Sequence, residues 1–159
     1  MSKVVRHEVR DFPAARDLPR PVSPEPASEA SQARSVLFIL YVRDQAASAA
    51  FYRAVLKRTP SLDVPGMTEF EVGAQARLGL MPEAGIRRLL GEAVPDPGRA
   101  SGIPRSEVYL VVRDPSEYHR RAIEAGAAEL SPVAPRGWGD DVGYSLDPDG
   151  HVLAFARPS

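Results

Sequence analysis

Two short runs of apolar residues, in equivalent places of the two halves of the chain, dominate its hydrophobic pattern. They span residues 36–42 and 108–112, and each is followed by an Arg-Asp pair. The aspartates of these pairs, Asp44 and Asp114, lie 114 − 44 = 70 positions apart. Runs this short, rich in branched and aromatic residues, are typical of strands covered on both faces. The pattern therefore predicts two such strands as part of an internal repeat.

A helix is expected after each of these strands. Residues 46–58 place apolar side chains near helical spacing, and Pro60 ends that helix because proline cannot continue it. In the second half, the pattern predicts a helix over about 116–125. Gly126 follows it, in the position where glycine commonly ends a helix.

A hairpin is predicted after each helix. In the first half its strands are expected at 68–72 and 76–81, and in the second half at 142–146 and 151–156. The residues between the two halves are rich in proline and glycine, and they offer one helical turn at 86–90. The chain thus repeats a strand, a helix and a hairpin, and a module this small must pack against its twin to cover its sheet.

The domain organisation follows from the same pattern. Residues 1–34 contain five of the sixteen prolines and are predicted to form an extended or mobile N-terminal arm. The alternative is an arm that clasps a partner subunit. The remaining domain is expected at 35–157, with modules at about 35–81 and 107–157 and a connector at 82–106.

Composition narrows the classes of partner. Apolar residues make up 43% of the chain, and 20 basic residues nearly balance 21 acidic ones, which argues against a disordered chain and against nucleic-acid binding. Cysteine is absent, which excludes disulfides, thiolate zinc sites and a cysteine nucleophile. No apolar run has the length of a signal peptide or a membrane span, so we expect a cytoplasmic protein that does not bind a membrane.

Two such modules in tandem resemble the vicinal-oxygen-chelate superfamily, which includes glyoxalase I, extradiol dioxygenases, fosfomycin-resistance enzymes and the bleomycin-binding resistance proteins. The resemblance implies an α+β fold of tandem βαβββ modules, whose curved sheets enclose a cleft that binds a divalent metal or an organic ligand. It covers about residues 35–157. The motifs that carry it lie at 40–44, 51–56, 125–127, 137–140, 143–144 and 147–151.

The resemblance also implies four metal-ligand positions, and this chain departs from them. Two lie seven residues before the aspartates that follow the first strand of each module, and they hold Leu37 and Glu107. The other two lie in the last strand of each module and hold Gly79 and Ala154. Only Glu107 can donate to a metal, and one carboxylate does not make a catalytic metal site. We therefore expect no metal and no other cofactor, which argues against glyoxalase-type isomerisation, ring cleavage and metal-assisted thiol addition.

Strand alternation assigns side chains to the cleft. If Leu37 faces the cleft, so do Ile39 and Tyr41, and the alternate residues of that strand, Val36, Phe38, Leu40 and Val42, lie under the helices. Aromatic and thioether groups with few polar groups are typical of a pocket for a flat organic ligand. The predicted ligand-binding residues are Tyr41, Arg77, Met81, Glu107, Tyr109 and Trp138.

Each of these residues also has a structural interpretation. Tyr41, Met81 and Tyr109 would then fill the cleft as ordinary core. Glu107 would form an ion pair with Arg77 instead of orienting a ligand. Trp138, in a loop flanked by glycines, would cover a sheet edge.

The remaining polar residues predict no catalytic group. His7, His119 and His151 join no ligand cluster and are expected at the surface. Asp140 and Asp141, and later Asp147 and Asp149, are expected to form turns and not a calcium loop. No Ser, His and Asp set indicates a hydrolase.

Three functions remain open. The first is a metal-free protein that binds, and sequesters, a flat organic compound. The second is an enzyme of the superfamily, of the lyase or dioxygenase type with an atypical site, which either uses a metal held by other donors or transfers a proton with Glu107 as the base. The third is a structural or dimerisation module with a filled cleft. A homodimer is expected because open sheet edges need cover.

Overall fold

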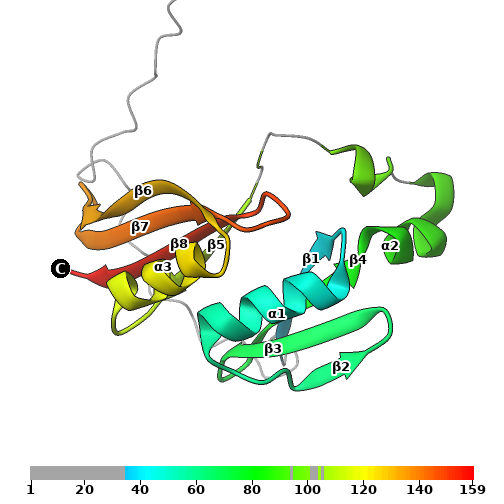
Figure 1. The fold of residues 1–159 in the computed structure, drawn as a ribbon, viewed down its shortest axis with the longest axis horizontal. Coiled ribbons are helices and arrows are strands. Elements are labelled where there is room, and N and C mark those ends of the chain that lie inside the picture. The colour runs from blue at the N-terminus through cyan, green and yellow to red at the C-terminus, as the bar shows by residue number, and fades with distance from the viewer. Residues whose placement is uncertain (1–34, 94, 101–103, 105) are drawn as a thin grey trace, which may run out of the picture. The chain divides into compact units, whose positions relative to one another are not determined.

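The computed structural model describes residues 35–159 except residue 94, residues 101–103 and residue 105. The N-terminal arm predicted for residues 1–34 lies outside the described residues. From residue 35 the chain forms two βαβββ modules joined by a connector (Figure 1). The first module comprises β1 Val36–Val42, α1 Gln45–Leu56, β2 Leu62–Val64, β3 Met67–Gly73 and β4 Ala76–Pro82. The second comprises β5 Glu107–Val111, α3 Pro115–Glu124, β6 Ala128–Pro135, β7 Asp140–Leu146 and β8 Val152–Pro158.

The two modules have the same sheet topology. The first sheet has the order β1-β4-β3-β2 and the second the order β5-β8-β7-β6. In each, the first and last strands of the module pair in parallel and the other neighbours pair antiparallel. This arrangement confirms the predicted α+β fold of tandem βαβββ modules. It also leaves β1 and β5 at the edge of their sheets.

The repeated Arg-Asp pairs have a structural explanation, because each aspartate caps the helix that follows it. The Asp44 carboxylate accepts the N–H of Ala47 at the start of α1, at 3.0 Å. Asp114 accepts the N–H of Glu117 at the start of α3, at 3.1 Å. A side-chain oxygen at this position satisfies an N–H group that has no partner within the helix. The sequence repeat therefore marks the point at which each strand gives way to its helix.

The core lies between the helices and the sheets and extends through both modules. Helices α1 and α3 pack side by side, in front of the two sheets in the view of Figure 1. Their buried side chains join those of both sheets in one cluster that includes Tyr52, Phe70, Leu78 and Phe155, each at most 2% exposed. Such a shared core explains why neither module needs to cover its sheet alone.

The prediction that the run 36–42 is covered on both faces is wrong. Val42 is fully buried, but Phe38 is 65% exposed and Val36 is 43% exposed. The reason is that β1 is an edge strand with β4 as its one neighbour, so its open side leaves side chains uncovered. The second run is also uncovered at its end, where Val111 is 67% exposed.

The connector contains more regular structure than the sequence indicates. Where the sequence predicts one helical turn, the helix α2 spans Glu83–Leu90. Two short 3-10 helices, Gly91–Ala93 and Pro97–Arg99, follow it. None of the described helices is long and apolar enough to cross a membrane.

Candidate ligand-binding site

A pocket of about 530 Å³ lies between the two modules, alongside the free edge of β5. Seven consecutive residues, 107–113, line it, so the strand presents its whole edge to the pocket. The N–H of Val112 donates to the carbonyl of Ala156 on β8, at 2.8 Å. Since successive peptide groups of a strand point in opposite directions, those of Tyr109 and Val111 point away from β8, towards the open edge. The pocket therefore offers backbone hydrogen-bonding groups as well as side chains.

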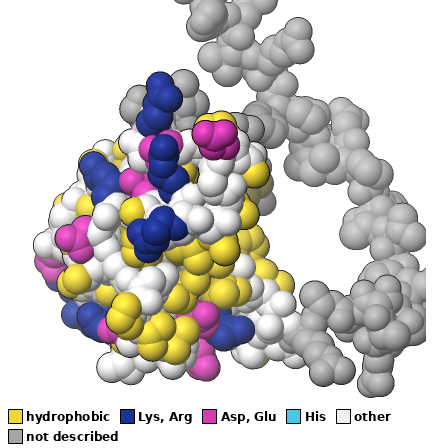
Figure 2. Space-filling model, turned by 90° about the vertical axis from the view of Figure 1, so that its right-hand side faces the viewer, with side chains coloured by type: hydrophobic (Ala, Val, Ile, Leu, Met, Phe, Trp, Pro, Cys, Tyr) yellow, Lys and Arg dark blue, Asp and Glu magenta, His cyan; other side chains and the backbone are white. Residues whose placement is uncertain are grey.

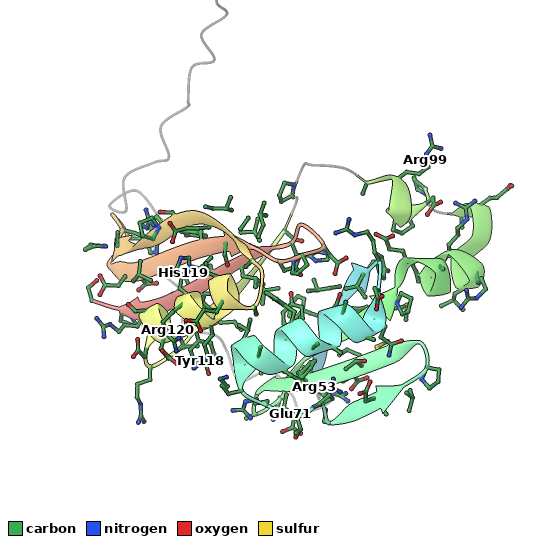
Figure 3. The ribbon with its side chains drawn as sticks, in the orientation of Figure 1. Arg53, Glu71, Arg99, Tyr118, His119 and Arg120 are labelled. Atoms are coloured by element: carbon green, nitrogen blue, oxygen red, sulfur yellow. The ribbon has the colours of Figure 1, made fainter. Side chains whose placement is uncertain are left out.

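The rest of the lining comes from both modules. Apolar groups of the first module, including Phe38, Leu56 and Leu78, line the pocket together with Tyr118 of α3. Figure 3 shows Tyr118 on α3 and Glu71 on β3, which both contribute to the lining. The other charged lining residues are Arg58, Arg77, Glu107 and Arg113.

Two aromatic side chains, Tyr109 and Trp138, lie together beside the pocket on the second module. The hydroxyl of Tyr109 donates to the Asp140 carboxylate at 2.6 Å, and the indole N–H of Trp138 lies 3.4 Å from the same hydroxyl. Burial, and then the hydrogen bond to Asp140, raises the pKa of Tyr109. Trp138 is 59% exposed, which leaves its ring available for stacking.

Glu107 lies on the same face of the sheet as Tyr109, two residues earlier on β5. Its charge, after burial, is the second cause that raises the pKa of Tyr144. Arg77 does not pair with Glu107; it binds Glu69 on β3, with 2.6 Å between guanidinium and carboxylate. In the part of the chain that the structure describes, no basic side chain lies within ion-pair distance of Glu107.

The structure brings together some of the predicted site residues and separates others. Arg77, Glu107 and Tyr109 line the same pocket, and Trp138 adjoins it through Tyr109. Tyr41 and Met81 lie opposite each other on β1 and β4 and do not line it. The sequence analysis missed three residues that lie on the second sheet near Tyr109 without lining the pocket: Asp140, which was assigned to a turn, and Tyr144 and Arg136. The alternation that selected Tyr109 also places Tyr144 on that face, through its pairing with Ala154.

The metal positions of the superfamily do not fit a metal in this chain. A Cβ atom on Gly79 would lie 3.2 Å from the Cδ1 of Leu37 and 3.3 Å from the Sδ of Met67. An acidic side chain there would therefore meet apolar atoms, and Ala154, at the equivalent position, is fully buried. Within the described ranges, no three His, Cys, Asp or Glu side chains are placed to hold a metal ion.

The surface prediction for His119 is wrong, because that residue is only 6% exposed. It lies on α3 (Figure 3), and its Nε2 is 2.9 Å from a carboxylate oxygen of Glu129 on β6. The ring sits above Gly143 of β7, where a Cβ atom would be 3.1 Å from its Nδ1. The absence of a side chain at Gly143 provides the space for the imidazole. His7 lies outside the described residues.

His151 is also not a free surface residue, because its Nδ1 lies 3.0 Å from the Asp147 carboxylate. Asp147, which is fully buried at its side chain, accepts the Tyr52 hydroxyl at 2.8 Å. Asp149 accepts the Ser48 hydroxyl at 2.6 Å and the Arg43 guanidinium at 3.2 Å. Both aspartates form the predicted turn, and they also join the second module to the first. We call this set the polar bridge: Arg43, Ser48, Tyr52, Asp147, Asp149 and His151.

Comparison with known proteins agrees with the fold and with the motifs in the sequence. Residues 37–156 match the family of glyoxalase-like domains, and the chain belongs to that family. An uncharacterised protein of Mycobacterium bovis is 27% identical over 122 residues, which cover 75% of this chain and 80% of the relative.

Two solved structures show the same fold. A glyoxalase-related enzyme from Fulvimarina pelagi superposes with a TM-score of 0.66 at 23% identity, covering 80% of this chain and 88% of the other. A glyoxalase/bleomycin resistance protein/dioxygenase from Nocardioides gives a TM-score of 0.64 at 24% identity, covering 80% and 85%. At these identities the likeness establishes the fold alone, and the family match over residues 37–156 is what supports the vicinal-oxygen-chelate superfamily.

Proposed function

We propose that this protein binds a small, flat organic compound without a metal, and sequesters it. The observation that carries the proposal is the pocket of about 530 Å³ beside β5, which has the size and the largely apolar lining of a small-molecule site. Tyr109 and Trp138 supply aromatic surface at its border, and Glu107 supplies a polar group that can orient a ligand. Enzymes of the superfamily that use a metal need ligands that Leu37, Gly79 and Ala154 do not provide.

Trp138 provides a direct test, because it is the single tryptophan of the chain. A screen of flat organic compounds should find at least one that quenches or shifts the indole emission saturably. Trp138→Ala should then weaken the binding of that compound by about 1 to 3 kcal/mol in calorimetric titrations. The melting temperature should change little, because the ring is largely exposed. A screen without a saturable ligand would count against the proposal.

We further propose that the protein is a homodimer that uses the open edge of β1. Figure 2 shows apolar side chains gathered over a continuous area of one face of the molecule. On β1, Phe38, Ile39 and Tyr41 are each at least 38% exposed, beside backbone groups without a neighbouring strand. Exposed apolar edge strands are commonly covered by a partner. Because Phe38 also lines the pocket, a second copy at β1 would narrow its opening.

Sedimentation at micromolar concentration tests this assembly. The wild-type protein should sediment as a dimer, and Phe38→Glu should shift it to the monomer by placing a charge in the interface. Leu89→Glu is the matched control, because Leu89 is 73% exposed on α2. A monomeric wild-type protein, or equal behaviour of the two variants, would contradict the dimer.

A further inference from the structure

We propose that the second sheet recognises a positive charge on the ligand, so that the preferred compound is an organic cation, such as an ammonium group, joined to a flat apolar body. This inference rests on the proposed binding function and adds a ligand class to it. The recognition surface, called here the aromatic face, is the side of the second sheet that carries Glu107, Tyr109, Asp140, Tyr144 and Trp138.

Three aromatic rings lie together on the aromatic face. Tyr109 and Tyr144 occupy the two strands on either side of β8, and both are in register with Ala154. Trp138 joins them through its hydrogen bond to Tyr109. The face of an aromatic ring carries partial negative charge and attracts a cation placed over it. A ligand that lies on this surface would therefore bind more tightly if it carried a positive group.

Within the described residues, two carboxylates of the aromatic face form no ion pair. Glu107 is exposed, and Asp140 is bound by the neutral hydroxyl of Tyr109. Over the described ranges neither lies within ion-pair distance of an arginine or lysine, whereas the adjacent Asp141 pairs with Arg157 at 3.2 Å. A cationic ligand would supply the missing positive charge to both groups.

Among the described residues, Arg136 places a cation over this face, and its hydrogen bonds go to neutral groups. Its guanidinium donates to the Ser131 hydroxyl at 2.7 Å and to the Val142 carbonyl at 2.9 Å. It also lies 5.3 Å from the ring centroid of Tyr144. A guanidinium is therefore already accommodated over one of the rings, and among the described residues it forms no ion pair with Glu107 or Asp140.

Arg58, Arg77 and Arg113 also line the pocket, and neither Arg77 nor Arg113 reverses this preference. Arg77 is neutralised by Glu69. Arg113 follows the far end of β5, six residues from Glu107, which corresponds to roughly 20 Å along an extended strand. An anionic group could therefore be held near Arg113 without competing for the aromatic face.

Three naphthalene derivatives test the charge preference with nearly constant shape. They are 2-naphthyltrimethylammonium, its uncharged isostere 2-tert-butylnaphthalene, and the anion 2-naphthoate. In calorimetric titrations of the full chain, we expect the cation to bind about ten-fold more tightly than the isostere, as for a partly desolvated cation over aromatic rings. Glu107→Gln should remove most of this advantage, and Glu92→Gln, an exposed carboxylate on the connector, should retain it.

The outcomes separate the two proposals. Equal binding of the cation and the isostere, or tighter binding of 2-naphthoate, overturns the charge preference and leaves small-molecule binding intact. An unchanged preference in Glu107→Gln also overturns it, because the aromatic face then does not supply the selectivity. Absence of binding by all three compounds overturns the ligand class, and the fluorescence screen decides separately whether the site binds any compound.

Discussion

The two modules contact each other at two interfaces, called crossings here, each between the helix of one module and the hairpin of the other. The internal repeat makes the two crossings equivalent, but their side chains differ. At the first, α1 reaches the β7–β8 turn through the polar bridge, with Tyr52 bound to Asp147 and Ser48 bound to Asp149. At the second, α3 and the end of β5 face β3 and β4 across the open pocket. The first crossing is closed by hydrogen bonds, and the second contains the pocket.

The repeat offset of 70 shows which residues cause the difference. Ser48 and Tyr52 correspond to Tyr118 and Ala122, so a buried hydroxyl of α1 is replaced by a methyl group on α3. The short turn 73–75 likewise carries no carboxylate to match Asp147 and Asp149. The two crossings therefore come from equivalent elements of the repeat, and their side chains close one of them and leave a pocket at the other.

The largest effect is expected from breaking the closed crossing. Asp147→Ala leaves the buried Tyr52 hydroxyl and the N–H groups of Asp149 and His151 without an acceptor. We expect the free energy of unfolding to fall by about 3 to 5 kcal/mol, measured by denaturant unfolding. Glu71→Ala at the open crossing, where the side chain is exposed, should change it by less than about 0.5 kcal/mol. Similar losses for both variants would show that the crossings do not differ in this way.

A pair of hydroxyl deletions sharpens the same comparison. Tyr52→Phe removes the bond to Asp147 from a residue that is 2% exposed, and should cost about 1 to 2 kcal/mol in unfolding free energy. Tyr118→Phe, beside the pocket, removes a hydroxyl that makes no hydrogen bond within the described residues and should cost less than about 0.5 kcal/mol. In the Asp147→Ala background, Tyr52→Phe should lose most of its effect, because its partner is already absent. An unchanged cost in that background would argue against direct coupling.

The repeat, the fold and most elements were predictable because short apolar runs, turn residues and helix caps are local signals. Two strands were not located. β2 has only three residues, and β6 contains prolines and two shifts of register, so neither shows a clean alternation. The helix α2 was underestimated because its helical pattern is only eight residues long and includes Gly85, and Leu89 and Leu90 stay exposed.

The site was less predictable, since it depends on how the modules meet. Alternation placed Glu107 and Tyr109 on one face, but it could not show that Arg77 binds Glu69 on its own sheet. Similarly, Asp147 and Asp149 were recognisable as turn residues, while their contacts with α1 join positions about one hundred residues apart. Contacts of that separation have no signature in the local sequence.

The smallest predicted effect is a pH dependence of the polar bridge. Burial opposes ionisation of Asp147, but the hydrogen bond and charge of His151 outweigh it and lower the Asp147 pKa below its ordinary 3.8. Burial also disfavours the His151 cation, but the hydrogen bond to Asp147 and the charges of Asp147, Asp149 and Glu83 raise the His151 pKa above its ordinary 6.5. The two groups therefore support each other in their ionised forms.

The sign of the effect follows from these directions. The contribution of Asp147 is present above its unfolded-state pKa and is lost as the pH falls through its lower folded-state pKa. The contribution of His151 is fully present below pH 6.5 and is lost as the pH rises through its higher folded-state pKa. The wild-type free energy of unfolding should therefore decline from pH 6 to pH 9, by less than either substitution above because the His151 side chain is 24% exposed. His151→Gln should flatten this decline in denaturant unfolding at each pH, while His119→Gln, on α3 and outside the polar bridge, should retain it. A decline of equal size in His151→Gln would assign the pH dependence to another group and leave the bridge as a purely hydrogen-bonded contact.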